Sequence, residues 1–577
     1  MLSLKLHFER HYRLISGFSR RYLVFHCTHS CYNMFQGSEN SGSGGYQETN
    51  TRATSHKETT NAETRQQQKL SKAERIALRN QASSENSLTT KIDYLSVDDE
   101  STQNFGEYQL IQSVATDSIS GRLFTSVSSL DKEKVGKQIW TRARVDTIRP
   151  KGRSAFLVLR QSQYTLQAVV SESDKVSRQM IKWITKEVGE ECLVDIYGNV
   201  VAAEVKSCSQ HDIELHVWKL YIVNKVNARL PIRVEDAGRP DWQEGVHVLR
   251  DTRLDNRVLD LRVPSQQAIF RIQSGVCQLF REILLREGFI EIHSPKIIAG
   301  ASEGGAEVFK LNYFGQNACL AQSPQLYKQM AICADLERVF EIGPVFRAEN
   351  SYTHRHLCEF TGLDIEMAIR EHYFEVLDVL EQLFIGIFEG LRLRFSTEIE
   401  LVQEKFQISP IRYLPAGQNP RLHFPEAVQL LKANGYIQED LDDLSTENEK
   451  ALGKIIKEKY GTDFYTLASF PATVRPFYTM PKAEDSRYSN SFDMFLRGEE
   501  IVSGAQRIHD SVLLESQVKA KNIPLSSIED YINAFKYGTP PHGGAGIGLE
   551  RVVMLYLGVG NIRECSMFPR DPKRLRP

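Results

Sequence analysis

The sequence has no run of apolar residues long enough to span a bilayer, which requires about 18 consecutive apolar residues. Its nine cysteines include no C-x-x-C pair, the spacing of many zinc and redox sites, so we expect reduced thiols. The formal net charge is only −2, so any basic surface for a nucleic acid must be local. These absences exclude a membrane-spanning protein and a disulfide-stabilised secreted domain, and they favour a cytoplasmic protein with no membrane partner. Because 577 residues exceed one hydrophobic core, two or three domains are expected.

The N-terminal extension, residues 1–107, is predicted to be disordered and partly basic. Residues 37–107 are poor in aromatics and rich in Ser, Thr, Asn, Gln and Gly. Residues 1–36 hold five basic residues and one acidic residue, a composition similar to a mitochondrial presequence. The alternative is that Met34 is the true start and the upstream stretch is incidental. One basic stripe at helical spacing could follow a phosphate backbone or be a solvated helix without a partner: Arg65, Lys69, Lys72, Arg75 and Arg79.

Residues 120–235 show the two-residue period of β-strands. Ile139, Thr141, Ala143 and Val145 alternate with polar residues, and four similar short segments follow, separated by turn residues. Five short strands at this length predict a small barrel, and the OB-fold is the usual barrel of this size.

One face of this barrel has residues suited to unpaired bases. Leu157 and Leu159 point to the core, whereas Phe156, Val158 and Arg160 are predicted to share the outer face. An aromatic ring and a guanidinium on one surface can stack on bases. For Phe156 taken alone, a plain core position is the simpler interpretation. Two further polar candidates for contacts to base edges are Gln167 and Glu214.

The pattern changes after residues 236–262, which we expect to be a hinge, and residues 263–577 are predicted to form a second, larger domain. Apolar residues recur at helical spacing from Ile269 to Leu284, and a short strand that ends at Pro295 follows Gly288. Farther on, 339–347 and 360–367 alternate as strands around a polar loop, which predicts an antiparallel pair with one apolar face. The polar face of the second strand carries Asp364 and Glu366. Because buried carboxylates are costly unless paired, we expect a ligand or a metal there.

Two sequence motifs in this domain carry a specific resemblance. F-R-A-E-N-S followed by T-H-R-H-L-C-E-F-T-G-L-D-I-E-M resembles motif 2 of the class II aminoacyl-tRNA synthetases, in the form of the subgroup that loads Asp, Asn and Lys. G-G-A-G-I-G-L-E-R, which ends at Arg551, is similar to motif 3, and the helix at 263–290 resembles motif 1, the family's dimer interface. The resemblance covers residues 120–577 and implies an α+β protein. It combines an OB-fold anticodon-binding barrel with a catalytic antiparallel sheet flanked by helices.

The resemblance implies ATP as the cofactor, with Arg347, Glu500 and Arg551 as the catalytic residues. Arg347 would bridge the α-phosphate and the amino-acid carboxylate, Phe360 would stack on adenine, and Arg551 would hold the γ-phosphate. The remaining expected ATP contacts are Ala348, Glu349, Arg355, His356, Leu357, Gly548, Leu549 and Glu550. Asp493 and Glu500 flank a predicted hairpin turn and could share Mg²⁺, although two exposed hairpin acids are the plainer alternative. In a regular strand Glu500 and Ser503 would point to opposite faces of the sheet, so a β-bulge is expected, near Gly504.

The amino acid is predicted from the run Q-S-P-Q-L-Y-K and from Arg507. In the family Lys328 faces the side-chain carboxylate of the substrate, where asparaginyl members have an apolar residue, and Arg507 adds a bidentate contact. Two unpaired cations would reject the neutral amide. The other residues expected to contact aspartate are Ser323, Gln325, Ser503, Arg347 and Glu303, the last in a glycine-rich lid at residues 300–305.

The sequence therefore predicts an enzyme that ligates L-aspartate to tRNA(Asp) through aspartyl-adenylate, at the expense of ATP. It is similar to the aspartyl, eukaryotic cytosolic type of the family, and a homodimer is implied. In the barrel, Phe156, Gln167 and Glu214 would contact the tRNA anticodon. Two alternatives remain open: an asparaginyl-type enzyme, which Lys328 opposes, and a catalytically inactive RNA-binding paralogue, which Arg347, Glu500 and Arg551 oppose.

Overall fold

The computed structural model describes residues 103–111, 120–299 and 308–577. The predicted extension up to residue 102 and the predicted lid with Glu303 lie outside these ranges. Among the described residues, no helix is long and apolar enough to cross a membrane.

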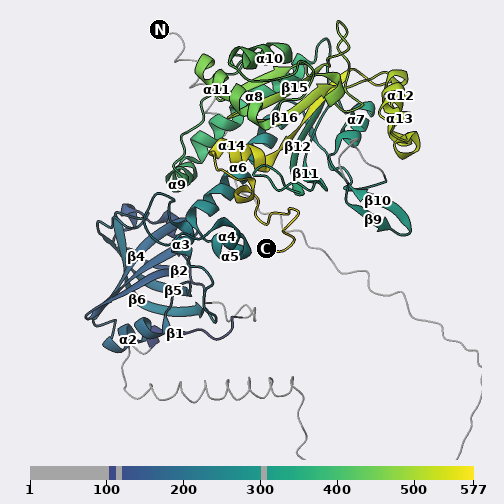
Figure 1. Cartoon of the computed structure of the whole chain (residues 1–577). Helices are drawn as coiled ribbons and strands as arrows, with labels where there is room; N and C mark the ends of the chain where they lie inside the picture. Colours follow the sequence, from purple (N-terminus) through teal and green to yellow (C-terminus); the bar gives the residue numbers. More distant parts are fainter. Residues whose placement is uncertain (1–102, 112–119, 300–307) are drawn as a thin grey trace, which may run out of the picture. The chain divides into compact units, whose positions relative to one another are not determined.

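The first folded part is a closed five-stranded barrel, drawn in blue in Figure 1. Strand β6 pairs with both β4 and β5, which closes the order β6-β4-β3-β2-β5, and β1 adds to β6 as a parallel edge. The strands are β1 (Phe105–Glu107), β2 (Gln138–Lys151), β3 (Ser154–Gln161), β4 (Tyr164–Ser171), β5 (Leu193–Ala202) and β6 (Ile213–Asn224). Helix α2 (Arg178–Glu187) begins with a cap from Ser177 and covers the barrel with Met180, Ile181 and Ile184. The predicted OB-like barrel is confirmed.

Arg160 does not lie on the outer face of this barrel, contrary to the prediction. Its side chain is only 4% exposed and forms ion pairs with Asp146, at 3.0 Å, and with Glu191. A buried guanidinium is stable when carboxylates neutralise it. The strand period gave the wrong side because these partners come from other parts of the chain, and a register irregularity between Val145 and Thr147 of β2 disturbs the pairing with β3.

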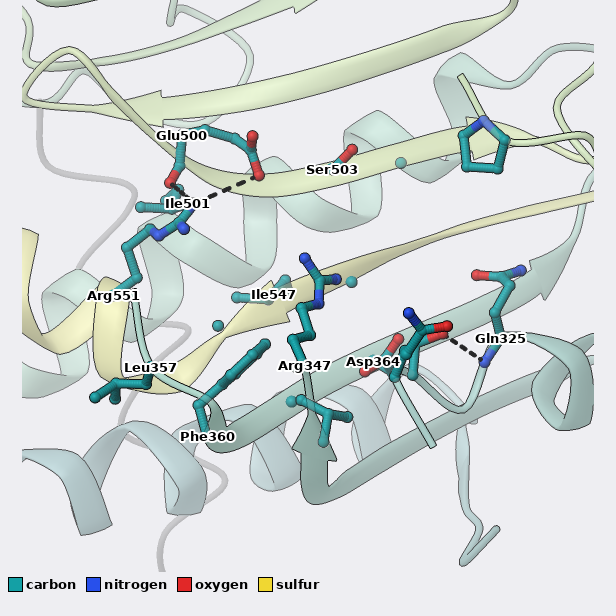
Figure 2. A pocket seen from close by; sticks show the side chains of 18 of the residues that line it. Gln325, Arg347, Leu357, Phe360, Asp364, Glu500, Ile501, Ser503, Ile547 and Arg551 are labelled. Carbon is teal, nitrogen blue, oxygen red and sulfur yellow. Dashed lines mark hydrogen bonds and ion pairs between the residues drawn. The ribbon is translucent and has the colours of Figure 1, made fainter. Parts of the chain in front are cut away.

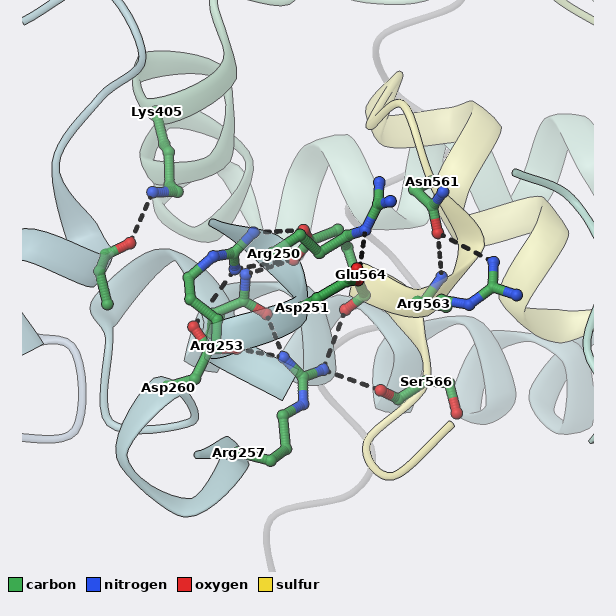
Figure 3. A network of polar contacts seen from close by, with 12 residues as sticks. Arg250, Asp251, Arg253, Arg257, Asp260, Lys405, Asn561, Arg563, Glu564 and Ser566 are labelled. Carbon is green, nitrogen blue, oxygen red and sulfur yellow. Dashed lines mark hydrogen bonds and ion pairs between the residues drawn. The ribbon is translucent and has the colours of Figure 1, made fainter. Parts of the chain in front are cut away.

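Three short helices occupy the segment expected to be a hinge: α3 (Val234–Gly238), α4 (Arg250–Asp255) and α5 (Arg257–Asp260). Figure 3 shows a buried polar network that joins α4 and α5 to η7 (Ile562–Cys565) near the C-terminus. Arg253 pairs with Asp260 and Glu564, and Arg257 pairs with Asp260. Gln266 donates a hydrogen bond of 2.8 Å to Glu564. All the charges are matched, so this segment is fixed to the C-terminal part of the chain.

Replacing Glu564 by Gln is expected to destabilise the protein by about 3–5 kcal/mol, because it leaves Arg253 buried without its main partner. Burial alone would raise the pKa of Glu564, but Arg253, Gln266 and Arg257 outweigh it and hold that pKa below its usual value. The lowered pKa stabilises the folded state above the unfolded pKa, and this stability is lost as the pH falls through the folded value. Denaturant unfolding at several pH values measures both effects. The control Glu389→Gln breaks an exposed pair with Arg392 and should cost under about 1 kcal/mol. Equal losses in both variants would contradict the assigned role.

An eight-stranded sheet forms the centre of the second part, in the order β13-β14-β15-β16-β17-β12-β11-β7. Its inner pairings are antiparallel, and only the edge strands β13 and β7 pair in parallel. The strands are β7 (Ile290–Glu291), β11 (Arg338–Phe346), β12 (Glu359–Ala368), β13 (Arg421–His423), β14 (Phe464–Ala468), β15 (Ser491–Leu496), β16 (Glu499–Gln506) and β17 (His542–Gly548). This confirms the predicted α+β fold with an antiparallel catalytic sheet.

Helices cover one face of this sheet and leave the other for the site. The largest core lies between the sheet and three helices: α6 (Pro264–Arg286), α8 (Phe374–Arg394) and α14 (Leu549–Leu557). Around them lie α7 (Gln325–Cys333), α9 (Ser396–Phe406), α10 (Phe424–Ala433), α11 (Thr446–Tyr460), α12 (Ser511–Ala520) and α13 (Glu529–Phe535). A small sheet is formed by β8 (Ile297–Ile298), β9 (Lys310–Tyr313) and β10 (Gln316–Leu320).

Candidate active site

A cavity of about 400 Å³ opens on the face of the sheet opposite the core helices. Figure 2 shows side chains that enter it from several elements, with Arg347 and Phe360 from the β11–β12 pair and Arg551 from α14. It is lined by fourteen of the predicted site residues: Ser323, Gln325, Arg347, Glu349, Arg355, His356, Leu357, Phe360, Glu500, Ser503, Arg507, Gly548, Glu550 and Arg551. Residues more than 200 positions apart in the sequence therefore meet at one site.

The β11–β12 pair places the first arginine of the site. Its antiparallel register sets Phe346 opposite Glu359, so β11 ends one residue before the predicted strand end and Arg347 is the first residue after it. The Arg347 guanidinium lies 5.6 Å from the centre of the Phe360 ring. A cation beside an aromatic ring provides a flat surface next to a positive charge. This arrangement fits a purine base that lies close to its own phosphates.

Arg355, in the loop between β11 and β12, is held by a helix that the sequence analysis did not connect with the site. Its guanidinium donates to Glu449, at 2.6 Å, and to the Thr446 hydroxyl, at 2.9 Å, in the first turn of α11. Burial raises the pKa of Glu449 to about 7, against the lowering effect of Arg355. Nothing in the sequence of 371–470 indicated these contacts, because they join segments about 90 residues apart.

The glycine-rich strand β17 passes close to the carboxylates of β12. A Cβ atom at Gly544 would lie 2.3 Å from Glu366 Oε2, so no side chain fits there. At the end of β17, Arg551 lies on the first turn of α14 and approaches Glu500 to 3.7 Å. Leu549 is 3% exposed and packs in the core, so the structure does not place its side chain in the cavity as predicted. The reason is helical geometry, since Leu549 and Arg551 point to different sides of α14.

The predicted acidic hairpin is present, with β15 and β16 joined at Arg497 and Gly498. The β-bulge lies at Ile501, between the pairs Met494–Val502 and Phe495–Glu500, and not at Gly504 as expected. At Gly504 a Cβ atom would collide with Phe492, which explains the glycine by packing instead.

Arg475 is a charged residue of this site that the sequence analysis missed. It donates to both carboxylate oxygens of Asp493, at 3.0 and 2.7 Å, and to the Ser503 hydroxyl, at 2.8 Å. Asp493 and Ser503 are cross-strand neighbours, so one guanidinium joins β15 and β16. Burial, followed by the charge of Asp493, raises the pKa of Glu500, while Arg551, Arg475 and Arg347 act in the opposite direction. The two acids therefore form an anionic site that gains from positive charge.

Lys328 is buried behind the cavity, and its ammonium group is fully hydrogen bonded. Its Nζ lies 3.0 Å from Asp364 Oδ1, 3.1 Å from the carbonyl oxygens of Ile365 and Ala545, and 3.3 Å from Glu366 Oε2. Its anions in the structure are therefore the acids of β12, whereas the resemblance implied the side-chain carboxylate of the substrate. Lys328 and Arg507 also account for the acids of β12, for which a ligand or metal was expected.

Arg507 is the second cation of this buried group. Its Nε donates to Glu366 at 2.9 Å, and its Nη2 lies 3.2 Å from the Gln325 amide oxygen. Burial alone would raise the pKa of Glu366, but Arg507 and Lys328 outweigh it and hold that pKa below its usual value. Among the described residues, no acceptor is within hydrogen-bond distance of Arg507 Nη1, and Arg507 lines the cavity.

The remaining predicted residues lie apart from the cavity lining. Ala348 follows Arg347 but does not line the cavity. Asp493 contacts the lining residue Arg475, and Lys328 contacts the lining residue Asp364. On the barrel, Gln167 donates to Glu214 at 2.8 Å, while Phe156 is half-buried on the outer side of β3.

The site lies on an antiparallel sheet, with Arg347 directly after β11 and Arg551 on the helix α14. This is the architecture of the class II aminoacyl-tRNA synthetases. The chain belongs to this family: the model described as tRNA synthetases class II (D, K and N) matches residues 249–572. Such enzymes use ATP.

Within the family, the chain is similar to proteins named cytoplasmic aspartate–tRNA ligase. The relative from Homo sapiens is 52% identical over 486 residues, which cover 83% of this chain and 96% of the relative. The relative from Caenorhabditis elegans is 49% identical, and the match covers 83% of this chain and 92% of the relative. The names of these relatives support the predicted cytoplasmic location.

Solved structures agree with this similarity. A putative aspartyl-tRNA synthetase from Leishmania major Friedlin matches with a TM-score of 0.78 and 45% identity, over 82% of this chain and 99% of that one. An asparaginyl-tRNA synthetase from Pyrococcus horikoshii, complexed with asparaginyl-adenylate, matches with a TM-score of 0.70 and 30% identity, over 80% and 100%. The fold is thus shared by both specificities, and the amino acid must be inferred from individual residues.

Proposed function

We propose that the protein activates L-aspartate with ATP and transfers it to tRNA(Asp). The observation that carries the proposal is the position of Arg507, with Lys328 behind it on Asp364, at the end of a cavity that Arg347, Phe360 and Arg551 also line. One end is suited to a nucleotide and the other to a carboxylate. A single cavity of this kind brings the two reactants of adenylate formation together.

ATP is proposed to bind between β11–β12 and α14. Phe360 supplies the surface for adenine, Arg347 lies where it can neutralise the α-phosphate, and Arg551 lies at the end for the γ-phosphate. The first step is the attack of the aspartate carboxylate on the α-phosphate, with pyrophosphate as the leaving group. Arg347 stabilises the charge that develops on the phosphoryl oxygens.

Asp493 and Glu500 are proposed to hold Mg²⁺ together with the ATP phosphates. Carboxylate oxygens are suitable ligands, and burial and then the charge of Asp493 raise the pKa of Glu500, so the pair would gain from a further cation. Among the described residues, no group of three or more His, Cys, Asp or Glu forms a complete metal site, which agrees with phosphates as further ligands. When bound, the metal would neutralise phosphate charge. Asp493, which Arg475 orients, and Glu500 would be the residues that hold it.

The proposed preference for aspartate follows from the charges around Arg507. Two cations and two carboxylates cancel before the substrate binds, and Arg507, which lines the cavity, is proposed to offer the donors of Nη1 to the substrate. A side-chain carboxylate can accept from these donors, whereas the NH₂ group of asparagine would meet them donor to donor. The mismatch of a buried polar group costs about 1–3 kcal/mol, enough to favour aspartate.

The second step is the transfer of aspartate to the terminal adenosine of the tRNA. We propose that the barrel holds the anticodon with Phe156, Gln167 and Glu214, because an aromatic and two polar groups lie on its outer side. A homodimer is proposed at the segment from α6 to β8, where Leu285, Ile290 and Ile297 expose between 48% and 55% of their surface.

ATP–pyrophosphate exchange tests the proposal with the purified full chain and either Asp or Asn as the amino acid. Exchange with aspartate that exceeds exchange with asparagine by at least about 100-fold is expected, since several contacts contribute. Exchange with asparagine alone would establish the asparaginyl alternative. No exchange with either amino acid would establish the inactive paralogue.

A further inference from the structure

A chain of buried hydrogen bonds runs from Arg507 to the backbone at Pro540, behind the cavity. Arg507 Nη2 donates to Gln325 Oε1 at 3.2 Å, and Gln325 Nε2 donates to Gln329 Oε1 at 2.9 Å, one turn along α7. Gln329 Nε2 meets His542 Nε2 at 3.1 Å, and His542 Nδ1 meets the Pro540 carbonyl oxygen at 2.8 Å. The four side chains are at most 4% exposed.

The two ends of this chain fix the direction of every hydrogen bond in it. A carbonyl oxygen only accepts, so His542 must carry its proton on Nδ1, and burial lowers the pKa of His542 to about 4, which keeps the ring neutral. His542 Nε2 is therefore an acceptor, and Gln329 must turn its NH₂ group toward it. At the other end a guanidinium only donates, so the oxygen of Gln325 must face Arg507.

Tyr531 supports the same direction from a different helix. Its hydroxyl lies 3.1 Å from Gln329 Oε1, and burial raises its pKa well above the usual value, so the group stays protonated. Gln329 Oε1 thus accepts from Gln325 and Tyr531, while the opposite end of the amide donates to His542. If the Gln329 amide were flipped, its NH₂ group would face the donors of Gln325 and Tyr531, and its oxygen would face the acceptor Nε2 of His542.

The consequence for the cavity is the orientation of Gln325, which lines it. Figure 2 shows the Gln325 amide with its oxygen turned toward the side where Arg347 and Asp364 lie. An amide oxygen has two lone pairs, and Arg507 uses one of them. The cavity therefore meets an acceptor at this point. The one strong donor on aspartate is its α-ammonium group, because both carboxylates only accept.

We propose that Gln329 and His542 are positioning residues that hold the Gln325 oxygen toward the α-ammonium group of the amino acid. This inference rests on the proposed function, because it assumes that aspartate occupies the cavity. Neither residue lines the cavity. Their effect is transmitted only through the polarity of the Gln325 amide.

The test compares Gln329→Leu with the control Tyr531→Phe. Gln329→Leu removes the acceptor of the Gln325 NH₂ group and leaves the Gln325 amide held by Arg507 alone. KM for aspartate should then rise about 10- to 100-fold, as for a lost hydrogen bond to a charged group. KM for ATP should stay within about 3-fold, because no contact of the chain reaches the nucleotide end. Tyr531→Phe keeps the chain from Arg507 to Pro540 intact and should change KM for aspartate by less than about 3-fold.

Succinate separates positioning from a general disturbance, since it is aspartate without the α-ammonium group. As an inhibitor competing with aspartate, succinate should bind Gln329→Leu and the unmodified protein with inhibition constants within about 3-fold. Gln329→Glu supplies the rescue in its protonated form, which burial favours: its carbonyl oxygen accepts from Gln325, its O–H donates to His542 Nε2, and KM for aspartate should stay within about 5-fold. Thermal unfolding and ATP binding identify any variant that has lost its fold.

Each outcome supports or opposes the inference. A higher KM for aspartate with an unchanged inhibition constant for succinate in Gln329→Leu supports it, and so does a near-normal KM for aspartate in Gln329→Glu. Parallel weakening of aspartate and succinate, or equal KM values in Gln329→Leu and Tyr531→Phe, overturn it. If Gln329→Leu unfolds, Gln329→Glu decides, since a loss of aspartate binding in the folded variant also overturns it. Absence of aspartate-dependent exchange in the unmodified protein would instead contradict the proposed function.

Discussion

Replacing Lys328 by Leu is expected to lower aspartate-dependent pyrophosphate exchange by at least about 1000-fold while ATP still binds. The ammonium lies between Asp364 and Glu366 and donates to two backbone carbonyl groups. Without it, the buried group around Arg507 changes from neutral to a net negative charge. That charge would repel the side-chain carboxylate of aspartate. Asp364 and Glu366 would also lose the cation that they share, and only Arg507 would remain beside them.

A matched control distinguishes substrate recognition from the loss of any buried lysine. Lys296 pairs with the buried Glu341 at 2.7 Å, but Glu341 does not line the cavity, whereas Asp364, the partner of Lys328, does. Lys296→Leu should destabilise the fold and leave KM for aspartate within about 3-fold. The measurements are exchange kinetics and ATP affinity for both variants. Retained aspartate activity in Lys328→Leu would show that the ammonium is dispensable.

Replacing Arg347 by Lys is expected to lower kcat for exchange by about 100- to 1000-fold, the usual cost of losing one preorganised donor to developing charge. The guanidinium is planar, lies beside Phe360 and can donate to a phosphate and a carboxylate at fixed angles. An ammonium keeps the charge but provides only a point contact. KM for ATP should rise by less than kcat falls, because Arg355 and Arg551 also line the nucleotide end.

Arg338→Lys is the control for this prediction, since Arg338 lies at the opposite end of β11 and outside the cavity. Its exchange kinetics should equal those of the unmodified protein within about 2-fold. If Arg347→Lys changed KM for ATP and left kcat unchanged, Arg347 would have no role in stabilising the charge of the reacting phosphoryl group.

The strand faces of the catalytic sheet could be predicted because a two-residue period relates sequence directly to geometry. Phe360, Gly362 and Asp364 line the cavity together, as alternation on β12 requires. The hairpin between Asp493 and Glu500 was predictable for the same reason. The chemical context of these residues was not, since it depends on which distant side chains approach them.

Three residues illustrate that limit. Arg475 approaches Asp493 across a sheet, Glu449 approaches Arg355 from a helix with no motif, and His542 joins Gln329 across more than 200 residues. Arg160 shows the opposite error, because a strand period gives a face but not the partners that can bury a charge. Ion pairs between distant segments follow from tertiary packing, and a single sequence contains no periodic signal for them.

Aminoacylation by the purified full chain tests the central claim most directly. The protein is mixed with ATP, Mg²⁺ and a tRNA that bears either the aspartate or the asparagine anticodon, and each amino acid is supplied in turn. The account predicts aspartyl-tRNA(Asp), with one AMP released for each tRNA charged. Asparaginyl-tRNA as the main product, or no charged tRNA from an enzyme that binds ATP and tRNA, would contradict it.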